Sequence, residues 1–181
     1  MASPRSFRAA VAPARFPEHL AAVRAIFRAY EQAAGAPVCF QGFERERATL
    51  PGAYAPPAGA VLLAFSGDGG VVGCVVLRPC ADATAEIKRL FVRPEARGKG
   101  LGRRLVEAAL DAARAAGYHR AVLETHATMT TALALYQALG FVESGDSDKG
   151  DVQRLALDLA RGGTGGPGSA SSSLSAASPN S

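Results

Sequence analysis

Apolar residues recur at helical spacing in the first quarter of the chain, and this predicts an amphipathic helix over Pro17 to Ala34. Its apolar positions are Leu20, Val23, Ile26, Phe27 and Tyr30. A short strand is expected before this helix, at Phe7 to Val11, and a second short helix after it, at Phe43 to Leu50. Pro51 and Gly52 would end that second helix.

Three runs of apolar and β-branched residues then predict an antiparallel meander. They are Val61 to Phe65, Val71 to Leu77 and Ile87 to Val92. The segment Gly67-Asp68-Gly69-Gly70 separates the first two runs and has the composition of a hairpin turn.

The helical period returns at Leu101 to Ala116, where apolar residues line one side and charged residues the other, and Gly117 ends the helix. A strand at Ala121 to Glu124, a helix at Thr130 to Leu139 and a strand at Val152 to Leu159 follow. Because strands flank the Leu101 helix, they form a βαβ crossover, which is parallel. The fold class is therefore α/β: a mixed, mostly antiparallel sheet with a parallel βαβ centre and helices on both faces.

Composition divides the chain of 181 residues into one domain and a tail. Residues 1–161 are expected to form the domain. Residues 162–181 are rich in Gly, Ser and Ala and lack charge, so burial would not offset their ordering entropy, and a disordered tail is expected. No apolar run is long enough to suggest a membrane span.

The first residues leave little room for a cleavable presequence, although Met1 to Ser6 has the Arg and Ser content of a transit peptide. The cytoplasm is the expected compartment, with an organelle as the alternative. The three cysteines, Cys39, Cys74 and Cys80, lack metal-site spacing, so we expect no metal site and free thiols that act as small core residues.

Charge is concentrated at one place. The net charge is only +4, and the basic residues are scattered apart from one cluster, which comprises Arg93, Arg97, Lys99, Arg103 and Arg104. A single local cluster favours a small anionic ligand over a nucleic-acid face. We therefore expect neither a nucleic-acid nor a membrane partner.

This cluster includes a glycine-rich turn between a strand and a helix. The turn reads Arg97-Gly98-Lys99-Gly100-Leu101-Gly102 and is followed by Arg103. Glycines let the backbone approach a ligand closely, and the first N–H groups of the helix point outward with the positive end of the helix dipole behind them. The turn therefore predicts a site for phosphate oxygens.

Two other phosphate loops fit this turn less well. A P-loop requires Ser or Thr after its Gly-Lys pair, but Gly100 follows Lys99. A dinucleotide fingerprint requires a different glycine spacing, and position 103 is Arg. Glu124 does lie about where a ribose-binding acid would be, so a nicotinamide-dependent oxidoreductase stays an alternative. The antiparallel meander argues against this alternative.

The residues resemble the GNAT superfamily of acyl-CoA-dependent N-acyltransferases over roughly Phe7 to Leu159. Arg97, Gly100 and Gly102 match the pyrophosphate motif Arg/Gln-x-x-Gly-x-Gly/Ala of that family. Ala132 to Phe141 matches its downstream motif Ala-x-x-Leu-Tyr-x-x-x-Gly-Phe, and the two motifs lie in the right order.

Within the family, the chain looks most similar to a small bacterial-type group. That group carries the motifs found here at Cys39 to Phe43 and at Leu50 to Gly59. One departure is Met129, which stands where many members have an Asn that contacts the cofactor.

The resemblance implies roles for particular residues. Acetyl-CoA would be the cosubstrate, with its pyrophosphate on the turn and its pantetheine arm along the main chain of Leu90, Phe91 and Val92. Tyr136 matches the acid that protonates the leaving thiolate. Glu86 is the candidate base, directly or through water. The cofactor-binding set is Leu90, Phe91, Val92, Arg97, Gly98, Lys99, Gly100, Leu101, Gly102 and Arg103.

The expected function is acetyl transfer from acetyl-CoA to a primary amine by direct attack in a ternary complex. A small-molecule acceptor is expected first and a protein or peptide amine second. A non-catalytic acyl-CoA sensor is the alternative from another class. Thr125, His126 and Thr128 follow the strand after the Leu101 helix and could face the acceptor. Either a monomer or a homodimer is compatible with the sequence.

Overall fold

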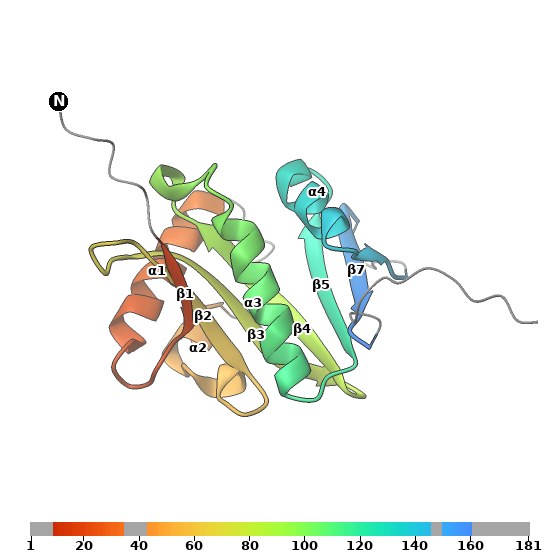
Figure 1. Ribbon diagram of the computed structural model, residues 1–181, viewed down its shortest axis with the longest axis horizontal. Helices are drawn as coiled ribbons and strands as arrows, with labels where there is room; N and C mark the ends of the chain where they lie inside the picture. The colour runs from red at the N-terminus through yellow and green to blue at the C-terminus, as the bar shows by residue number, and fades with distance from the viewer. Residues whose placement is uncertain (1–8, 35–42, 146–149, 161–181) are drawn as a thin grey trace, which may run out of the picture.

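A computed structural model describes residues 9–34, 43–145 and 150–160 of the chain (Figure 1). The strands are β1 (Ala10–Pro13), β2 (Ala60–Phe65), β3 (Val71–Ala81), β4 (Thr84–Val92), β5 (Arg120–His126), β6 (Val142–Glu143) and β7 (Val152–Asp158). The helices are α1 (Leu20–Ala34), α2 (Phe43–Ala48), α3 (Leu101–Ala115) and α4 (Thr130–Ala138), with short 3-10 turns η2 (Gly52–Tyr54) and η3 (Pro94–Ala96).

The strands form one mixed sheet in the order β1-β2-β3-β4-β5-β7-β6. Every neighbouring pair is antiparallel except β4 and β5, which are parallel. Helix α3 makes the crossover between those two strands, so the predicted βαβ unit lies at the centre of the sheet (Figure 1). The expected fold class is confirmed.

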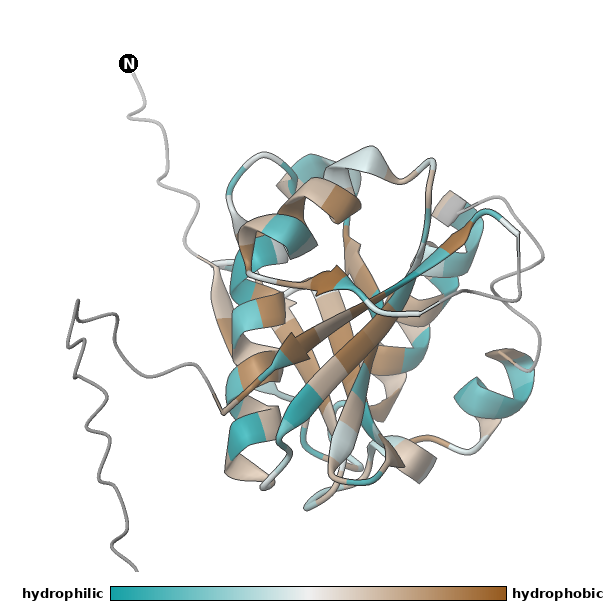
Figure 2. Ribbon diagram, turned by 90° about the vertical axis from the view of Figure 1, so that its right-hand side faces the viewer, coloured by the Kyte–Doolittle hydropathy of each residue, from teal (hydrophilic) through white to brown (hydrophobic). Residues whose placement is uncertain are grey.

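Alternating residues of the strands build a separate core on each face of the sheet. On β3, Val75 and Leu77 pack in the core that contains α3, whereas Cys74 and Val76 pack in the core that contains α1. Figure 2 shows the strands as largely hydrophobic ribbons, while the helices alternate between hydrophobic and hydrophilic residues. The helical stripe predicted at the start of the chain is therefore the face of α1 that covers the sheet.

Helix α4 belongs to the α3 face of the sheet. Its buried Tyr136 and its half-buried Leu135 and Leu139 pack against the core that contains Leu105 of α3. Figure 1 shows α4 above the end of β5, beside the N-terminal part of α3. The two helices whose sequences carry the family motifs thus lie on the same side of the sheet.

Several boundaries differ from the sequence prediction. Strands β3 and β4 extend into a hairpin whose turn, Asp82 and Ala83, has positive φ angles of 42° and 55°. No Gly or Asn marks that turn, and the last three residues of β3 are exposed, so hydrophobic patterning did not reveal the hairpin. The short β6 was not predicted either, because its two residues are exposed.

The expected core position of the cysteines holds for Cys74 and is wrong for Cys80. Cys74 is buried under α1, whereas Cys80 is exposed on the polar end of β3. Three predictions lie outside the described residues. They concern Cys39, the motif Cys39 to Phe43 except for Phe43 itself, and the tail at 162–181. Within the part of the chain that the structure describes, no helix is both long and apolar enough to cross a membrane.

Candidate active site

Strands β4 and β5 pair over only a short stretch and then separate. The parallel register joins Thr84, Ala85 and Glu86 to the first three residues of β5 and goes no further. Beyond Glu86, the edge of β4 that faces β5 makes no strand pairing among the described residues. Its backbone groups are therefore available to an extended partner that lies along the strand.

A pocket of about 490 Å³ occupies this separation. Strands β4, β5 and β7 and helices α1 and α4 contribute to its wall. The lining residues are Tyr30, Glu86, Ile87, Lys88, Arg89, Leu90, Glu124, Thr125, His126, Met129, Ala132, Tyr136 and Val152. The structure thus brings three predicted site residues, Glu86, Leu90 and Tyr136, into one pocket.

Tyr136 is held at the pocket by the way α4 ends. The backbone N–H of Phe141 donates to the Tyr136 carbonyl at 3.1 Å, and the N–H of Gly140 donates to the Gln137 carbonyl at 2.9 Å. Gly140 has a φ of +91°, which only glycine adopts without strain. The Phe141 ring then packs edge-on against the Tyr136 ring, with 5.8 Å between centroids. The Tyr-x-x-x-Gly-Phe motif is therefore a helix cap that fixes the tyrosine.

The phenol of Tyr136 is protonated at neutral pH. Burial raises its pKa well above the usual value, and the nearby Tyr30 phenol adds to the rise. The side chain is only 7% exposed. A protonated, buried hydroxyl in a pocket can donate a hydrogen bond to an anion there.

Glu86 is ionised and held between two cations. Its Oε2 accepts from Arg78 Nε at 2.6 Å, and its Oε1 accepts from Lys88 Nζ at 3.2 Å. Burial alone would raise the pKa of Glu86, but the Lys88 ammonium and the Arg78 guanidinium outweigh it and leave the pKa below its usual value. A carboxylate of lowered pKa is a weak proton acceptor.

The histidine of this pocket also has a defined partner. His126 ends β5 half-buried, and its Nδ1 lies 2.8 Å from the hydroxyl of Thr128. Thr125 and His126 line the pocket as expected, whereas Thr128 does not line it and contacts His126 Nδ1 through its hydroxyl and its backbone N–H. Met129, at the position of the family's asparagine, also lines the pocket and is 46% exposed.

Strand β4 carries a bulge inside the pocket. Cys74 of β3 lies opposite Phe91, but Val76 lies opposite Lys88, so Arg89 and Leu90 together face Val75. Arg89 has a φ of +58°, the left-handed conformation. Leu90 and Val92 are half-buried on the α3 face, whereas Phe91 is buried in the core under α1.

The predicted phosphate turn lies just beyond the end of β4. Gly98 and Gly100 both have a φ of +72°, and a Cβ at either position would meet nothing within 4 Å. These positions need glycine for conformation, and the space beside them is open. Gly100 is the N-cap of α3, and no side chain caps this end of the helix. The first intrahelical bond runs from Arg104 N to Gly100 O, so the N–H groups of Leu101, Gly102 and Arg103 can serve a ligand.

The basic side chains of the turn are exposed and contact backbone carbonyls of the segment just before it. Arg97 Nε donates to the Val92 carbonyl at 3.0 Å, and Lys99 Nζ donates to the Glu95 carbonyl at 3.0 Å. Arg103 lies 3.4 Å from Glu107 on the helix surface. The turn residues do not line the pocket, but the unpaired edge of β4 runs from the pocket toward them.

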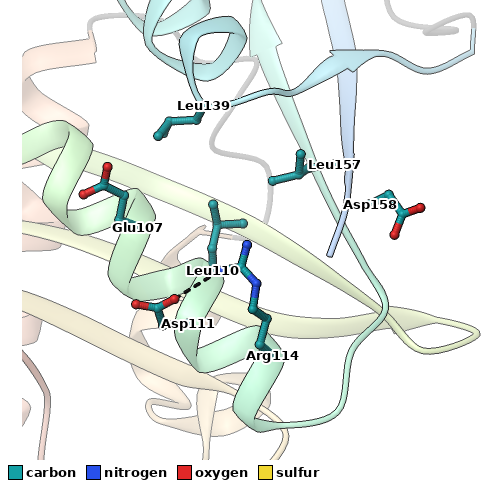
Figure 3. Close-up of a pocket in the computed structure, with 7 residues that line it drawn as sticks. All are labelled: Glu107, Leu110, Asp111, Arg114, Leu139, Leu157 and Asp158. Carbon is teal, nitrogen blue, oxygen red and sulfur yellow. Dashed lines mark hydrogen bonds and ion pairs between the residues drawn. The ribbon is translucent and has the colours of Figure 1, made fainter. Parts of the chain in front are cut away.

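A second pocket, of about 540 Å³, lies farther along α3 (Figure 3). Its lining residues are Glu107, Leu110, Asp111 and Arg114 of α3, Leu139, and Leu157 and Asp158. Asp111 and Arg114 pair with each other at 3.0 Å. This pocket contains none of the predicted site residues, and no group of His, Cys, Asp or Glu among the described residues could hold a metal ion.

Sequence reasoning missed several residues of the first pocket. Arg78 meets Glu86 across the β3–β4 hairpin, a pairing that depends on register and has no signal in sequence. Tyr30 was assigned to the apolar stripe of α1, and it does border the core, but it also reaches the pocket. Arg89 gave no signal, because an arginine inside a strand pattern does not indicate a positive φ.

Known proteins resemble this chain in sequence. The model of the acetyltransferase (GNAT) family matches residues 21–141. An uncharacterized N-acetyltransferase of Schizosaccharomyces pombe is 34% identical over 132 residues, covering 72% of this chain and 81% of the relative. Human N-acetylaspartate synthetase is 33% identical over 138 residues, covering 76% of this chain but only 43% of that protein.

Solved structures share the fold at low sequence identity. A GNAT-family acetyltransferase of Staphylococcus aureus has a TM-score of 0.70 at 14% identity, covering 84% of this chain and 99% of that one. The PaiA N-acetyltransferase of Thermoplasma acidophilum, in complex with coenzyme A, has a TM-score of 0.68 at 18% identity, covering 83% and 99%. The chain belongs to the acetyltransferase (GNAT) family, and it is an N-acetyltransferase that uses acetyl-CoA as its cosubstrate.

Proposed function

We propose that this enzyme acetylates a primary amine of a small molecule by direct attack on acetyl-CoA within a ternary complex. The observation that carries the proposal is the pocket at the unpaired edge of β4, which contains both Glu86 and Tyr136. The edge of β4 leads from there toward the uncapped N-terminus of α3. One continuous surface could therefore hold the cofactor while an amine approaches from the α1 face.

In this proposal, the main chain holds most of the cofactor. The N–H groups of Leu101, Gly102 and Arg103 bind the pyrophosphate, together with the backbone of Gly98 and Gly100. Arg97 and Lys99 add cationic donors. Leu90, Phe91 and Val92 bind the pantetheine arm through backbone groups, and a backbone N–H at the bulge of β4 polarises the thioester oxygen. Acetyl-CoA supplies the activated acetyl thioester.

The amine must lose a proton before it attacks. An alkylammonium has a pKa of about 10.4, so deprotonation at pH 7 costs about 4 to 5 kcal/mol. Direct transfer to a carboxylate with a pKa of about 4.3 costs about 8 kcal/mol, and the lowered pKa of Glu86 makes this step harder still. We therefore assign Glu86 the role of orienting the amine or a water molecule, while the proton leaves through water to solvent.

Tyr136 acts on the leaving sulfur. The amine nitrogen bonds to the carbonyl carbon, the carbon–sulfur bond then breaks to leave a thiolate, and the nitrogen loses its second proton to solvent. Because the pKa of Tyr136 is raised, full proton transfer to a thiolate of pKa about 8.5 is uphill. The phenol instead stabilises the developing charge by a hydrogen bond, and the thiolate can take its proton from solvent afterwards.

Two names among the similar proteins support a small acceptor. Human N-acetylaspartate synthetase is named for an acetylated amino acid, and a chimera of Vibrio cholerae SpeG is named a spermidine N-acetyltransferase. A protein amine remains the second candidate acceptor. A non-catalytic sensor is the candidate from another class, and the presence of Tyr136 and Glu86 in one pocket argues against it.

The test is incubation of the pure protein with acetyl-CoA and a panel of amines while free thiol is followed. The panel includes amino acids, polyamines, aromatic amines and lysine peptides. Cys80 is exposed and accessible to thiol reagents, so a reaction without amine is the blank. We expect thiol release with at least one small amine. Tight acetyl-CoA binding with no thiol release from any amine would support the sensor instead.

Domain bounds and cellular compartment are also part of the proposal. We propose that residues 1–161 form the catalytic domain, that residues 162–181 form a solvated tail, and that the enzyme works in the cytoplasm. Size-exclusion chromatography with light scattering would decide between the monomer and the homodimer.

A further inference from the structure

The bulge in β4 has an unusual residue at its centre. Arg89 combines a φ of +58° with a side chain that is almost completely buried. The left-handed conformation is strained for a residue that carries a Cβ, and glycine or asparagine is the usual choice at such a position. Something outside the local backbone must therefore hold Arg89 in this conformation.

The side chain of Arg89 is fixed from the other end by α2. Its Nε lies 3.1 Å from Glu46 Oε1, and its Nη2 lies 2.8 Å from Glu46 Oε2, so the pair is bidentate. The two side chains are 6% and 18% exposed. A buried bidentate pair has a defined geometry, unlike a surface ion pair.

Aromatic packing and the main chain complete the arrangement. The Arg89 guanidinium carbon lies 4.5 Å from the ring centroid of Phe43 and 6.0 Å from that of Tyr30. At the other end of the residue, the Arg89 carbonyl accepts from Cys74 Sγ at 3.4 Å. Both the guanidinium and the carbonyl are thus held, and the backbone between them passes through the bulge.

We infer that Glu46 and Arg89 are positioning residues, which hold the β4 bulge in the conformation that presents a backbone N–H to the thioester oxygen. This inference rests on the proposed function, which assigns that polarising role to the bulge. Neither side chain touches the reacting atoms. The ion pair instead links the position of α2 to the shape of β4 in the pocket.

A merely structural ion pair would leave a different signature. The comparison uses two double variants, Glu46→Gln with Arg89→Gly and Glu46→Gln with Arg89→Val, so that no carboxylate is left buried without its partner. Valine fills more of the vacated space, whereas glycine tolerates a positive φ and a β-branched residue does not. If the pair only packs the core, the valine variant should behave more like the wild type. If the pair holds the bulge, the glycine variant should.

The readout is the infrared carbonyl frequency of bound acetyl-CoA that is isotope-labelled at the carbonyl carbon. Hydrogen bonding to the oxygen lowers this frequency, and no acceptor amine is needed. We expect the wild type and the glycine variant to show a clear lowering, and the valine variant a frequency near that of free acetyl-CoA. Coenzyme A affinity, measured by calorimetry, should stay within about threefold across the set. In the single variant Glu46→Gln, the carbonyl frequency should be lowered by less than in the wild type. This single variant replaces the comparison if a double variant does not fold.

The outcomes separate the two proposals. A wild-type protein that binds acetyl-CoA with no lowering of the frequency would overturn the proposed polarisation, and this inference with it. A lowering in the wild type that the valine variant keeps in full would overturn this inference alone. This inference alone would also be overturned if the lowering of the frequency tracked the melting temperatures of the variants and did not depend on whether residue 89 tolerates a positive φ.

Discussion

Replacing Tyr136 by phenylalanine removes one hydroxyl from the pocket and leaves the ring in place. The ring packs against Phe141 and the helix cap involves only backbone groups, so both features should survive. A hydrogen bond to a charged group contributes about 1.5 to 3 kcal/mol. If the phenol stabilises the leaving thiolate, kcat should therefore fall about tenfold to somewhat over a hundredfold.

The assay is thiol release with the amine found in the acceptor screen, at saturating acetyl-CoA, together with calorimetric titration of coenzyme A. We expect kcat to fall as stated, while coenzyme A affinity changes less than about threefold. Tyr118→Phe is the matched control, because the Tyr118 hydroxyl donates to the Ala58 carbonyl at 2.7 Å and does not line the pocket. This control should keep the wild-type kcat.

Two results for Tyr136→Phe would refute the proposed role of the phenol, one in kcat and one in coenzyme A affinity. Equal kcat in wild type and Tyr136→Phe would remove the phenol from the mechanism. A loss of coenzyme A affinity as large as the loss of kcat would show that the hydroxyl serves binding and not the chemical step. The raised pKa of Tyr136 adds a further condition, since no loss of activity below about pH 10 should be traceable to its ionisation.

Three variants and one alkylation reaction test the phosphate turn, Glu86 and the cysteines. Gly100→Ala should destabilise the fold by about 1 kcal/mol, measured by denaturant melts, and weaken coenzyme A binding, measured by calorimetry. Gly69→Ala, in the β2–β3 turn at a φ of +85°, is the control. It should lose similar stability and leave coenzyme A binding unchanged. The ionised form of Glu86 stabilises the fold above its unfolded pKa of about 4.3, and that contribution is lost as pH falls through its lower folded value. Glu86→Gln should therefore lose less stability than wild type between about pH 5 and pH 3. Burial raises the pKa of the Cys74 thiol to about 12, so alkylation of the native protein followed by mass spectrometry should find Cys80 modified and Cys74 intact.

The sequence was informative where local rules decide the structure. The glycines of the phosphate turn, the helical stripe of α3 and the parallel crossover all follow from residue type and spacing, and the structure has them in the expected places. The downstream motif has a local cause as well, because Gly140 and Phe141 cap the helix that carries Tyr136. The turn, the helical stripe and the helix cap each depend on residues close together in the chain, and the crossover follows from the order of the elements.

What the sequence missed depends on register and on distant contacts. The ion pair between Arg78 and Glu86 requires the exact pairing of β3 with β4, which a bulge shifts by one residue. The contact between Glu46 and Arg89 joins residues 43 positions apart. This difference has a chemical consequence. The family resemblance made Glu86 the candidate base, but Lys88 and Arg78 lower its pKa.

In the proposed complex, acetyl-CoA lies along β4 with its pyrophosphate at the start of α3. Amide hydrogen exchange of the protein with and without coenzyme A is the direct measurement, because most of the groups proposed to hold the cofactor are backbone N–H groups. We expect slower exchange at Leu90 to Val92 and at Gly98 to Arg103, with no change around the pocket of Figure 3. Protection confined to Glu107, Asp111 and Asp158, or no protection at β4 and the turn under saturating coenzyme A, would contradict it.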